Sequence, residues 1–544
     1  MKCRPWLLVF LGLAPLCASA QLGSVQRALV LKPGSGGFVG PLGVDQFGEA
    51  LAALGDVDGD GVQDLAVGAP LDDDGGVERG AVWILFLNPD GSVRAEQKIS
   101  QTQGGFTGLL ADEGRFGRKL ARTGDLDGDG VPDLAVLSQA PNRLWVLLLD
   151  ASGTVKGHAE TLYTDPVFAP AAQAADFQNG DLAALGDVTG DGLGDLALGA
   201  PHDPDGAFGA GAVWIAALGA NGAVSATRKI SQLTGGFTGP LPAESRFGAA
   251  LEDLGDLDGD GTRELAVVSP GSAFKGQVWV LSLDATSTVV TQHLRGPEDY
   301  GLAWPSGQGG TLGAVGRVLE PLGDLDGDGV GDLAIGFPYW TFPGSTEGGF
   351  VLGFLGSDGS VRRRLRIGED RGGLGDLPRN SGLGAALAPL GDLDGDGRPE
   401  LAVGAPGLRA SGVMGGGVYL LSLAPSAVRN GSGLNPLTLT APEPIFGTTW
   451  SATLDCSGHA PNFAFLFGYR SPLAPSPTFA GELLVGGTQR FFLQGVHAGG
   501  PVALSIGVPP PSIGLLDVPI HVQGACAGAP GLRLSNALDL LVGR

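Results

Sequence analysis

Clusters of aspartate that alternate with glycine are the residues of this sequence best suited to chemistry. The first cluster reads DVDGDGVQD from Asp56 to Asp64. Closely spaced carboxylates supply the hard oxygens, about six to eight, that Ca²⁺ prefers, and glycine lets the backbone turn tightly around an ion. We expect oxygen ligands from Asp56, Asp58, Asp60, the carbonyl of Val62, and Asp64. The cluster therefore predicts a calcium-binding turn.

The same pattern occurs six times, at 56, 125, 187, 256, 324 and 392. Equivalent offsets predict five further ligand sets: Asp125, Asp127, Asp129, Val131 and Asp133; Asp187, Thr189, Asp191, Leu193 and Asp195; Asp256, Asp258, Asp260, Thr262 and Glu264; Asp324, Asp326, Asp328, Val330 and Asp332; Asp392, Asp394, Asp396, Arg398 and Glu400. We expect about six structural Ca²⁺ ions. The third site should be the weakest, because Thr189 supplies an oxygen without a charge.

Two other interpretations of the acidic loops are less favoured. An EF-hand needs a bidentate Glu at the twelfth loop position and a helix after it, whereas the twelfth residue here is Val67 in a strand-like stretch. A metal-free acidic turn is the second alternative, since Asp and Gly are common turn residues. Six copies in register disfavour it, because so many clustered carboxylates repel one another without cations.

The elements around each loop predict a β-propeller. Successive loops begin 69, 62, 69, 68 and 68 residues apart, which indicates repeated structural units. In the first unit, apolar stretches at 50–54, 65–67, 81–87 and 92–100 are short, rich in strand-forming residues and separated by turn signals. Four strands per unit fit one propeller blade. We therefore expect an all-β fold.

The chain ends predict how the ring closes. The sixth unit lacks a good fourth strand, and residues 24–42 match residues 92–110 at an offset of 68 without a gap. The N-terminal strand would thus complete the last blade and remove an open sheet edge. The prediction is a closed six-bladed ring over about 24–423.

Short motifs beside the loops resemble a known repeat family. Phe47-Gly48 precedes the first loop and Gly68-Ala69-Pro70 follows it, and related copies recur in the other units. These motifs are similar to the FG-GAP repeats of the integrin alpha-chain propeller. The resemblance implies a calcium-stabilised propeller with each acidic loop between the first two strands of a blade. Integrin propellers usually have seven blades, so a seven-bladed ring is the alternative, and integrin receptor function is not implied.

The termini predict an exported protein. Lys2 and Arg4 precede an apolar run at 6–16 that is too short to span a bilayer, and 18–20 fits a signal-peptide cleavage site. We expect residues 1–20 to be a signal peptide, 21–425 the propeller and 426–544 a small β-sandwich-like domain. Cys456 and Cys526, the two cysteines beyond the signal peptide, would then form a disulfide. The protein would be secreted or located at the cell surface, with no membrane span.

The function is less constrained than the fold. A formal net charge of −24 disfavours nucleic acid and anionic membranes as partners. The sequence contains no catalytic motif such as His-Glu-x-x-His or Gly-x-Ser-x-Gly. Tyr339, Trp340 and Phe342 could contact a sugar or a protein partner, although core packing is the alternative role. Four tryptophans recur at one position of the blade, which indicates that their side chains belong to the hydrophobic core: Trp83, Trp145, Trp214 and Trp279.

We therefore predict a non-catalytic binding or adhesion module whose partner is a glycan or an extracellular protein. Two alternatives stay open: an extracellular polysaccharide lyase or hydrolase built on a propeller, and a passive structural protein of an envelope.

Overall fold

The computed structural model describes the chain in segments: 24–168, 173, 175–257, 260–271, 277–295, 318–325, 329–338, 348–356, 361–368, 374, 377–378, 380–409, 413–424, 428–429, 439–440, 449–455, 462–478, 481–497, 501–507, 519–526 and 533–541. Packing divides it into two units, one ending at Ser426 and one containing the strands from Val428 onward. Among the described residues, no helix is long and apolar enough to cross a membrane.

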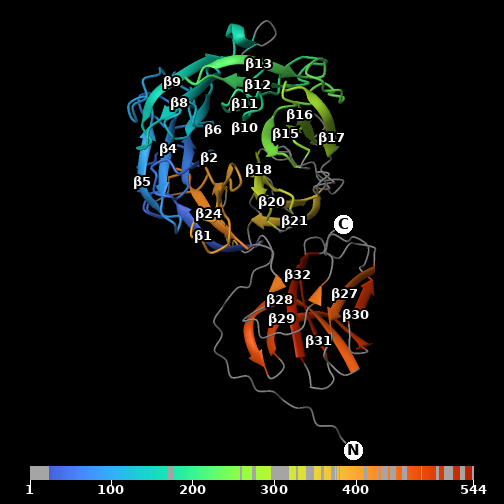
Figure 1. Ribbon diagram of the computed structural model, residues 1–544. Coiled ribbons are helices and arrows are strands. Elements are labelled where there is room, and N and C mark those ends of the chain that lie inside the picture. Colours follow the sequence, from blue (N-terminus) through green and yellow to red (C-terminus); the bar gives the residue numbers. More distant parts are fainter. Residues whose placement is uncertain are drawn as a thin grey trace, which may run out of the picture. The chain divides into compact units, whose positions relative to one another are not determined.

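The first unit is a six-bladed β-propeller, as the repeat predicts. Six four-stranded antiparallel sheets are arranged around a central axis (Figure 1). Blade 1 is β2 (Ala50–Gly55), β3 (Asp64–Ala69), β4 (Ala81–Leu87) and β5 (Val93–Ile99). Blade 2 is β6 (Lys119–Gly124), β7 (Asp133–Ser138), β8 (Arg143–Leu149) and β9 (Val155–Leu162). Blade 3 is β10 (Leu182–Gly186), β11 (Asp195–Ala200), β12 (Ala212–Leu218) and β13 (Val224–Ile230).

The remaining blades repeat this order. Blade 4 is β14 (Ala250–Gly255), β15 (Arg263–Ser269), β16 (Gln277–Leu283) and β17 (Val289–Arg295). Blade 5 is β18 (Val318–Gly323), β19 (Asp332–Phe337), β20 (Gly349–Leu355) and β21 (Val361–Gly368). Blade 6 is β22 (Leu387–Gly391), β23 (Glu400–Gly404), β24 (Val418–Leu423) and β1 (Val25–Leu31). One 3-10 turn, η1 (Pro166–Phe168), lies between blades 2 and 3.

The ring closes through the N-terminal strand. Strand β1 pairs antiparallel with β24, with Val25 opposite Leu423 and Leu31 opposite Val418 (Figure 1). The backbone N–H of Ala424 donates to the carbonyl of Ser24 at 2.9 Å. The prediction that the first strand completes the last blade is therefore confirmed, and β24 gains the fourth-strand partner that the third strands of the other blades have.

The hydrophobic core lies between neighbouring blades. In blades 1 to 4 the third strand carries a tryptophan that packs edge-on against a phenylalanine. In blade 1 the ring centroids of Trp83 and Phe38 are 5.3 Å apart, and in blade 2 those of Trp145 and Phe106 are 5.2 Å apart. All four recurring tryptophans are at most 5% exposed. Their predicted core role is confirmed, and each joins the strands of two blades.

The paired glycines of the repeat allow neighbouring blades to approach closely. Gly117 has φ +88°, which favours glycine, and a Cβ there would lie 2.4 Å from the carbonyl oxygen of Ala81. A Cβ on Gly68 would lie 2.0 Å from the carbonyl oxygen of Gly117. Any side chain at either position would push blades 1 and 2 apart, so the repeat requires glycine there.

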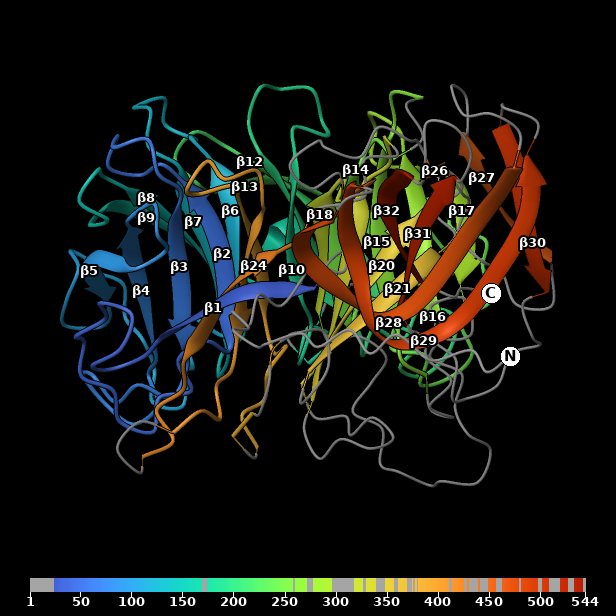
Figure 2. The same ribbon diagram turned by 90° about the horizontal axis from the view of Figure 1, so that it is seen from below.

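Antiparallel pairing places the loops of the ring on two opposite faces. Within each blade, the connections from the first to the second strand and from the third to the fourth lie on one face, which we call the acidic-loop face. The connections from the second to the third strand, and from one blade to the next, lie on the opposite face. Figure 2 shows the propeller strands running between these two sets of loops.

The C-terminal unit consists of strands only among its described residues. The five-stranded sheet has the order β25-β32-β31-β28-β29 and the three-stranded sheet the order β26-β27-β30. The strands are β25 (Val428–Arg429), β26 (Leu439–Thr440), β27 (Thr449–Asp455), β28 (Asn462–Thr478), β29 (Gly481–His497), β30 (Pro501–Gly507), β31 (Pro519–Cys526) and β32 (Arg533–Leu541). Strands β28 and β29 have 17 residues each, far more than the short apolar stretches within them predict.

Candidate calcium-binding loops

Each well-described acidic loop is folded by its own first aspartate. In the first loop, Asp56 Oδ1 accepts the backbone N–H groups of Gly59 and Asp60 at 2.7 and 3.0 Å, and its Oδ2 accepts that of Gly61 at 2.8 Å. Asp125 makes the same three contacts in the second loop. These bonds turn the backbone so that the following side chains converge, which is how short aspartate side chains stabilise turns.

Three loops bring three carboxylates close enough together to hold a metal ion. Within each group, one ligand atom from every residue lies within 4.8 Å of the others. The groups are Asp56, Asp58 and Asp64; Asp125, Asp127 and Asp133; and Asp392, Asp394 and Glu400. In each group the three residues are the first, third and ninth residues of the acidic loop, and all three belong to the predicted ligand set. An all-carboxylate donor set at this spacing fits a hard divalent cation such as Ca²⁺.

The carboxylate at the fifth residue of each of these loops lies outside the three-carboxylate groups. In the first loop, Asp60 Oδ1 accepts the N–H of Val62 at 2.9 Å, and Asp129 and Asp396 make the same bond in their loops. The carboxylate at this position therefore helps to fold the turn.

The last carboxylate of each loop is buried and joins the loop to its blade. Asp64 is 0% exposed, and its two oxygens accept the N–H groups of Val57 and Leu87 at 2.9 and 3.1 Å. Burial raises the pKa of Asp64 to about 6, and the two N–H groups partly oppose that shift. Burial likewise raises the pKa of Asp133 to about 6. A bound cation would favour the charged form of these carboxylates.

The third loop keeps the turn but has one carboxylate fewer. Asp187 Oδ1 accepts the N–H groups of Gly190 and Asp191 at 2.6 and 2.9 Å, as in the first loop. Thr189 stands at the third position, and its N–H donates to Asp195 at 2.9 Å. The prediction that this is the weakest metal site stays a prediction.

The fourth and fifth loops are described only in part. Asp258, Asp326 and Asp328 lie outside the described residues. In the described portions, the N–H of Leu257 donates to Glu264 at 2.7 Å and that of Leu325 donates to Asp332 at 2.9 Å. The closing carboxylates of both loops thus make the same bond as Asp64.

Sequence reasoning missed a basic side chain that reaches the loop from the outermost strand of the same blade. Arg94 on β5 pairs with Asp58 and lies 2.9 Å from Asp60. Lys156 on β9 lies 2.8 Å from Asp127 and also pairs with Asp129, and Arg27 on β1 lies 3.4 Å from Asp394. In blades 1 and 2 the sequence does carry a signal for this contact, which is a basic residue directly after the first valine of the fourth strand.

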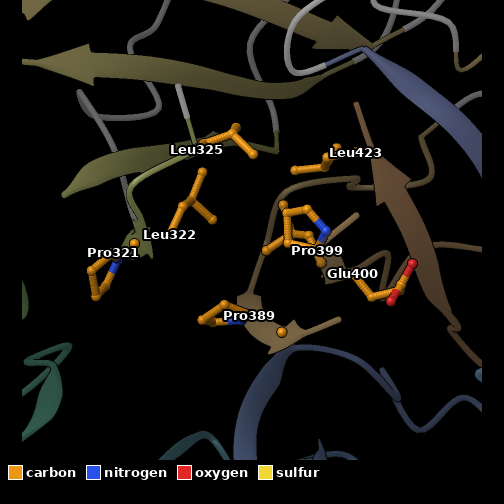
Figure 3. Close-up of a pocket in the computed structure, with 10 residues that line it drawn as sticks. Pro321, Leu322, Leu325, Pro389, Pro399, Glu400 and Leu423 are labelled. Atoms are coloured by element: carbon orange, nitrogen blue, oxygen red, sulfur yellow. The ribbon is translucent and has the colours of Figure 1, made fainter. Parts of the chain in front are cut away.

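A largely apolar cavity of about 260 Å³ lies beside the sixth loop, between blades 5 and 6. Figure 3 shows it surrounded by prolines and leucines, with Glu400 at its margin. Glu400 is 4% exposed, burial raises its pKa, and Oε2 accepts the N–H of Leu393 at 2.9 Å. This side chain therefore belongs to the acidic loop, and the cavity itself offers little polar chemistry.

Several predicted residues lie outside the described part of the structure. These are the aromatic residues Tyr339, Trp340 and Phe342 and the cysteine Cys456. The predicted ligand contact and the predicted disulfide between Cys456 and Cys526 stay predictions.

Comparison with known families identifies the repeat. The model of the FG-GAP repeat matches residues 47–85, 179–215, 252–281, 321–354 and 383–421. These segments fall in blades 1, 3, 4, 5 and 6, and the acidic loops of those five blades lie within them.

Comparison with curated proteins finds integrin alpha chains. Integrin alpha-5 of Xenopus laevis is 42% identical over 17% of this chain, integrin alpha-PS5 of Drosophila melanogaster 34% over 28%, and human integrin alpha-IIb 32% over 30%. The aligned segments span only 8%, 14% and 15% of those relatives. Among solved structures, a Trypanosoma rangeli sialidase aligns over 98% of this chain and 94% of its own, at 11% identity and a TM-score of 0.34, a likeness too weak to inform on function.

The fold and the acidic loops define a β-propeller with candidate calcium sites. The chain is an FG-GAP repeat protein with partial similarity to integrin alpha chains.

Proposed function

We propose that this protein is an exported, calcium-stabilised propeller that acts as a non-catalytic binding or adhesion module. The observation that carries the proposal is the set of three-carboxylate groups on the acidic-loop face of a closed ring. Cations bound there would stabilise the ring and leave the opposite face to contact a partner. The similarity to integrin alpha chains supports a binding role, and the short aligned segments leave the partner open.

Calcium would act here as a structural ion. Asp56, Asp58 and Asp64 would hold it in the first loop, with equivalent residues in the second and sixth loops. When bound, the ion supplies positive charge that offsets the repulsion within each cluster. It would also join the turn to the buried Asp64, and through the Asp64 bond to Leu87 N–H, to the third strand of the blade. Six ions, one for each loop, is the stoichiometry that the repeat supports.

The sequence pattern at 1–20, which is typical of a signal peptide, supports export to a secreted or cell-surface location. We also propose that the C-terminal unit is a small β-sandwich, which its two sheets support. Tyr339, Trp340 and Phe342 are the sequence-based candidates for ligand contact in blade 5.

The experiment uses the mature full-length chain, loaded with calcium, on arrays of glycans and immobilised extracellular proteins. Specific binding that disappears with a chelator and returns with calcium is the expected result. Release of products from polysaccharides would instead favour the enzyme alternative. Silence in both assays would overturn the binding role and leave a structural role. Tyr339→Ala and Trp340→Ala test the blade-5 residues in the same assay.

A further inference from the structure

On the face opposite the acidic loops, long connections reach across the seams between some neighbouring blades, whereas the connection of blade 2 is short. In blades 1 and 3, the connection from the second to the third strand has eleven residues, 70–80 and 201–211. Both loops reach the next blade. The carbonyl of Val77 accepts the N–H of Glu113 at 2.7 Å, and the carbonyl of Phe208 accepts that of Glu244 at 2.8 Å. These loops therefore close the seam between their blade and the next.

The equivalent connection in blade 2 has four residues, 139–142. The N–H of Gln139 donates to the carbonyl of Gly114 at 2.6 Å, so the loop is tied back toward the segment that leads into its own blade. A cavity of about 460 Å³ lies between this loop and the segment that leads into blade 3. We call it the blade-2 pocket. The family model that matches five other segments skips this blade, consistent with its altered loop.

One side of the pocket is formed by the filled seam between blades 1 and 2. Glu113 and Arg115 have φ +59° and +49°, and the equivalent Glu244 and Arg246 have φ +61° and +57°. Arg115 is also held by Glu78, whose carboxylate lies 2.9 Å from its guanidinium. On this side of the pocket the backbone is thus held as it is at the filled seam between blades 3 and 4. The pocket lies beside the short loop of blade 2, where blades 1 and 3 have connections of eleven residues.

The lining of the pocket has a particular chemistry. Three carboxamides, Gln139, Asn142 and Gln178, line it together with one acid, Glu113, and one base, Arg115. A carboxamide both donates and accepts hydrogen bonds, which suits pairs of neighbouring hydroxyl groups. The single acid and the single base balance in formal charge, and Arg115 is already paired with Glu78. The lining therefore lacks the concentrated charge that would select an ion.

The volume and the lining of the blade-2 pocket agree with a small polar ligand. A volume of 460 Å³ lies within the range of about 300–1,000 Å³ typical of small-molecule pockets. The exposed Pro141 adds an apolar surface against which the C–H face of a ring could rest.

We propose that the blade-2 pocket binds a neutral saccharide through the carboxamides of Gln139 and Gln178. This rests on the proposed binding function and names its ligand class and its site. The acidic loops lie on the other face of the ring, so calcium would support the site through the fold and would not contact the sugar.

The test is binding of the calcium-loaded mature chain to an array of immobilised neutral and acidic oligosaccharides. The double variant Gln139→Ala, Gln178→Ala should bind neutral sugars about tenfold more weakly or worse, because two hydrogen-bonding side chains are lost. A second variant replaces residues 139–142 with residues 70–80 of blade 1 and should abolish binding by filling the pocket. Both variants should keep the melting temperature of the wild type. The matched control is Glu244→Gln at the filled seam, which should bind as the wild type does.

Different failures point to different errors. Saccharide binding that survives both pocket variants would overturn the pocket and leave the proposed function standing. Binding restricted to acidic sugars, or to proteins alone, would overturn the ligand class and still leave a binding module. Absence of any ligand for a folded, calcium-loaded chain would overturn the pocket and the proposed function together.

Discussion

The first and third acidic loops have the same backbone hydrogen bonds and differ in the carboxylates they gather. Asp56 and Asp187 each accept the N–H groups three and four residues later. The first loop then brings Asp58 into a three-carboxylate group, whereas the third has Thr189 at that position. The turn and the metal site are therefore separable. The first and fifth positions fold the turn, and the third position sets how much charge it offers to a cation.

The outermost strand beside each loop also differs in charge between the two blades. Arg94 pairs with the first loop, while the equivalent residue beside the third loop is Ser225, whose hydroxyl donates to the carbonyl of Ala217 at 3.2 Å. The loop with more carboxylates thus has a basic neighbour, and the loop with fewer has none at this position. Local charge, more than backbone shape, separates the two loops.

Removal of calcium should have the largest effect. Loops with three clustered carboxylates should bind Ca²⁺ and stabilise the folded state, each by about 2.7 kcal/mol when calcium is at a hundred times the dissociation constant. A chelator should therefore lower the melting temperature of the mature chain strongly, and added calcium should restore it. Calorimetric scans with chelator and with calcium provide the measurement. Superimposable scans would contradict the account.

Exchange of the third position should come next. Asp58→Thr should weaken calcium binding at the first loop by about one to two orders of magnitude, because one ligand charge is lost. Thr189→Asp should strengthen the third site in return. Terbium luminescence titration of both variants and the wild type checks this, and the fold should persist in both because Asp56 and Asp187 still form the turns. Equal titrations in all three proteins would show that this position does not set affinity.

Two glutamates on the first strands of blades 4 and 5 allow the effect of charge to be tested away from the acidic loops. Three residues before the glycine that ends the first strand, four blades have alanine (Ala52, Ala121, Ala183 and Ala388), while blades 4 and 5 have Glu252 and Glu320. Burial raises the pKa of both glutamates well above 4.5, and for Glu252 repulsion from Glu320, Asp181 and Asp253 adds to the shift. A carboxyl whose pKa is raised by folding lowers the stability of the folded protein as the pH rises above the pKa of that carboxyl in the unfolded chain.

The double variant Glu252→Ala, Glu320→Ala should therefore be more stable than the wild type at pH 7, by about 1–3 kcal/mol. The gain should shrink as pH falls toward 4.5, where the glutamates take up protons in both states. Urea unfolding at several pH values measures this. A gain that is independent of pH would mean that packing, and not ionisation, is responsible.

Loss of the basic neighbour should have the smallest effect. Arg94→Gln should tighten calcium binding at the first loop by a few fold, since an exposed cation that pairs with Asp58 and Asp60 competes weakly with the metal. The difference should fade as salt concentration rises. The matched change Ser225→Arg should weaken the third loop to a similar degree. Weaker binding after Arg94→Gln would show that the arginine supports the site.

The elements that could be predicted were those encoded over short stretches of chain. The loops, the four strands of each blade and the tryptophan core follow from turn residues, strand-forming residues and the regular repeat. Closure by β1 followed from an offset between two sequence segments. Arg94 and the blade-2 pocket were missed because they depend on which side chains meet across a blade or across a seam. A loop that is seven residues short is visible in sequence, but the space that it leaves is not.

The central claim is that the acidic loops hold calcium in the folded chain. Elemental analysis of the mature protein, equilibrated with calcium and freed of loosely bound ions, tests it most directly. The expected result is several calcium ions per chain, at least one for each of the three carboxylate groups. Less than one ion per folded chain would contradict it.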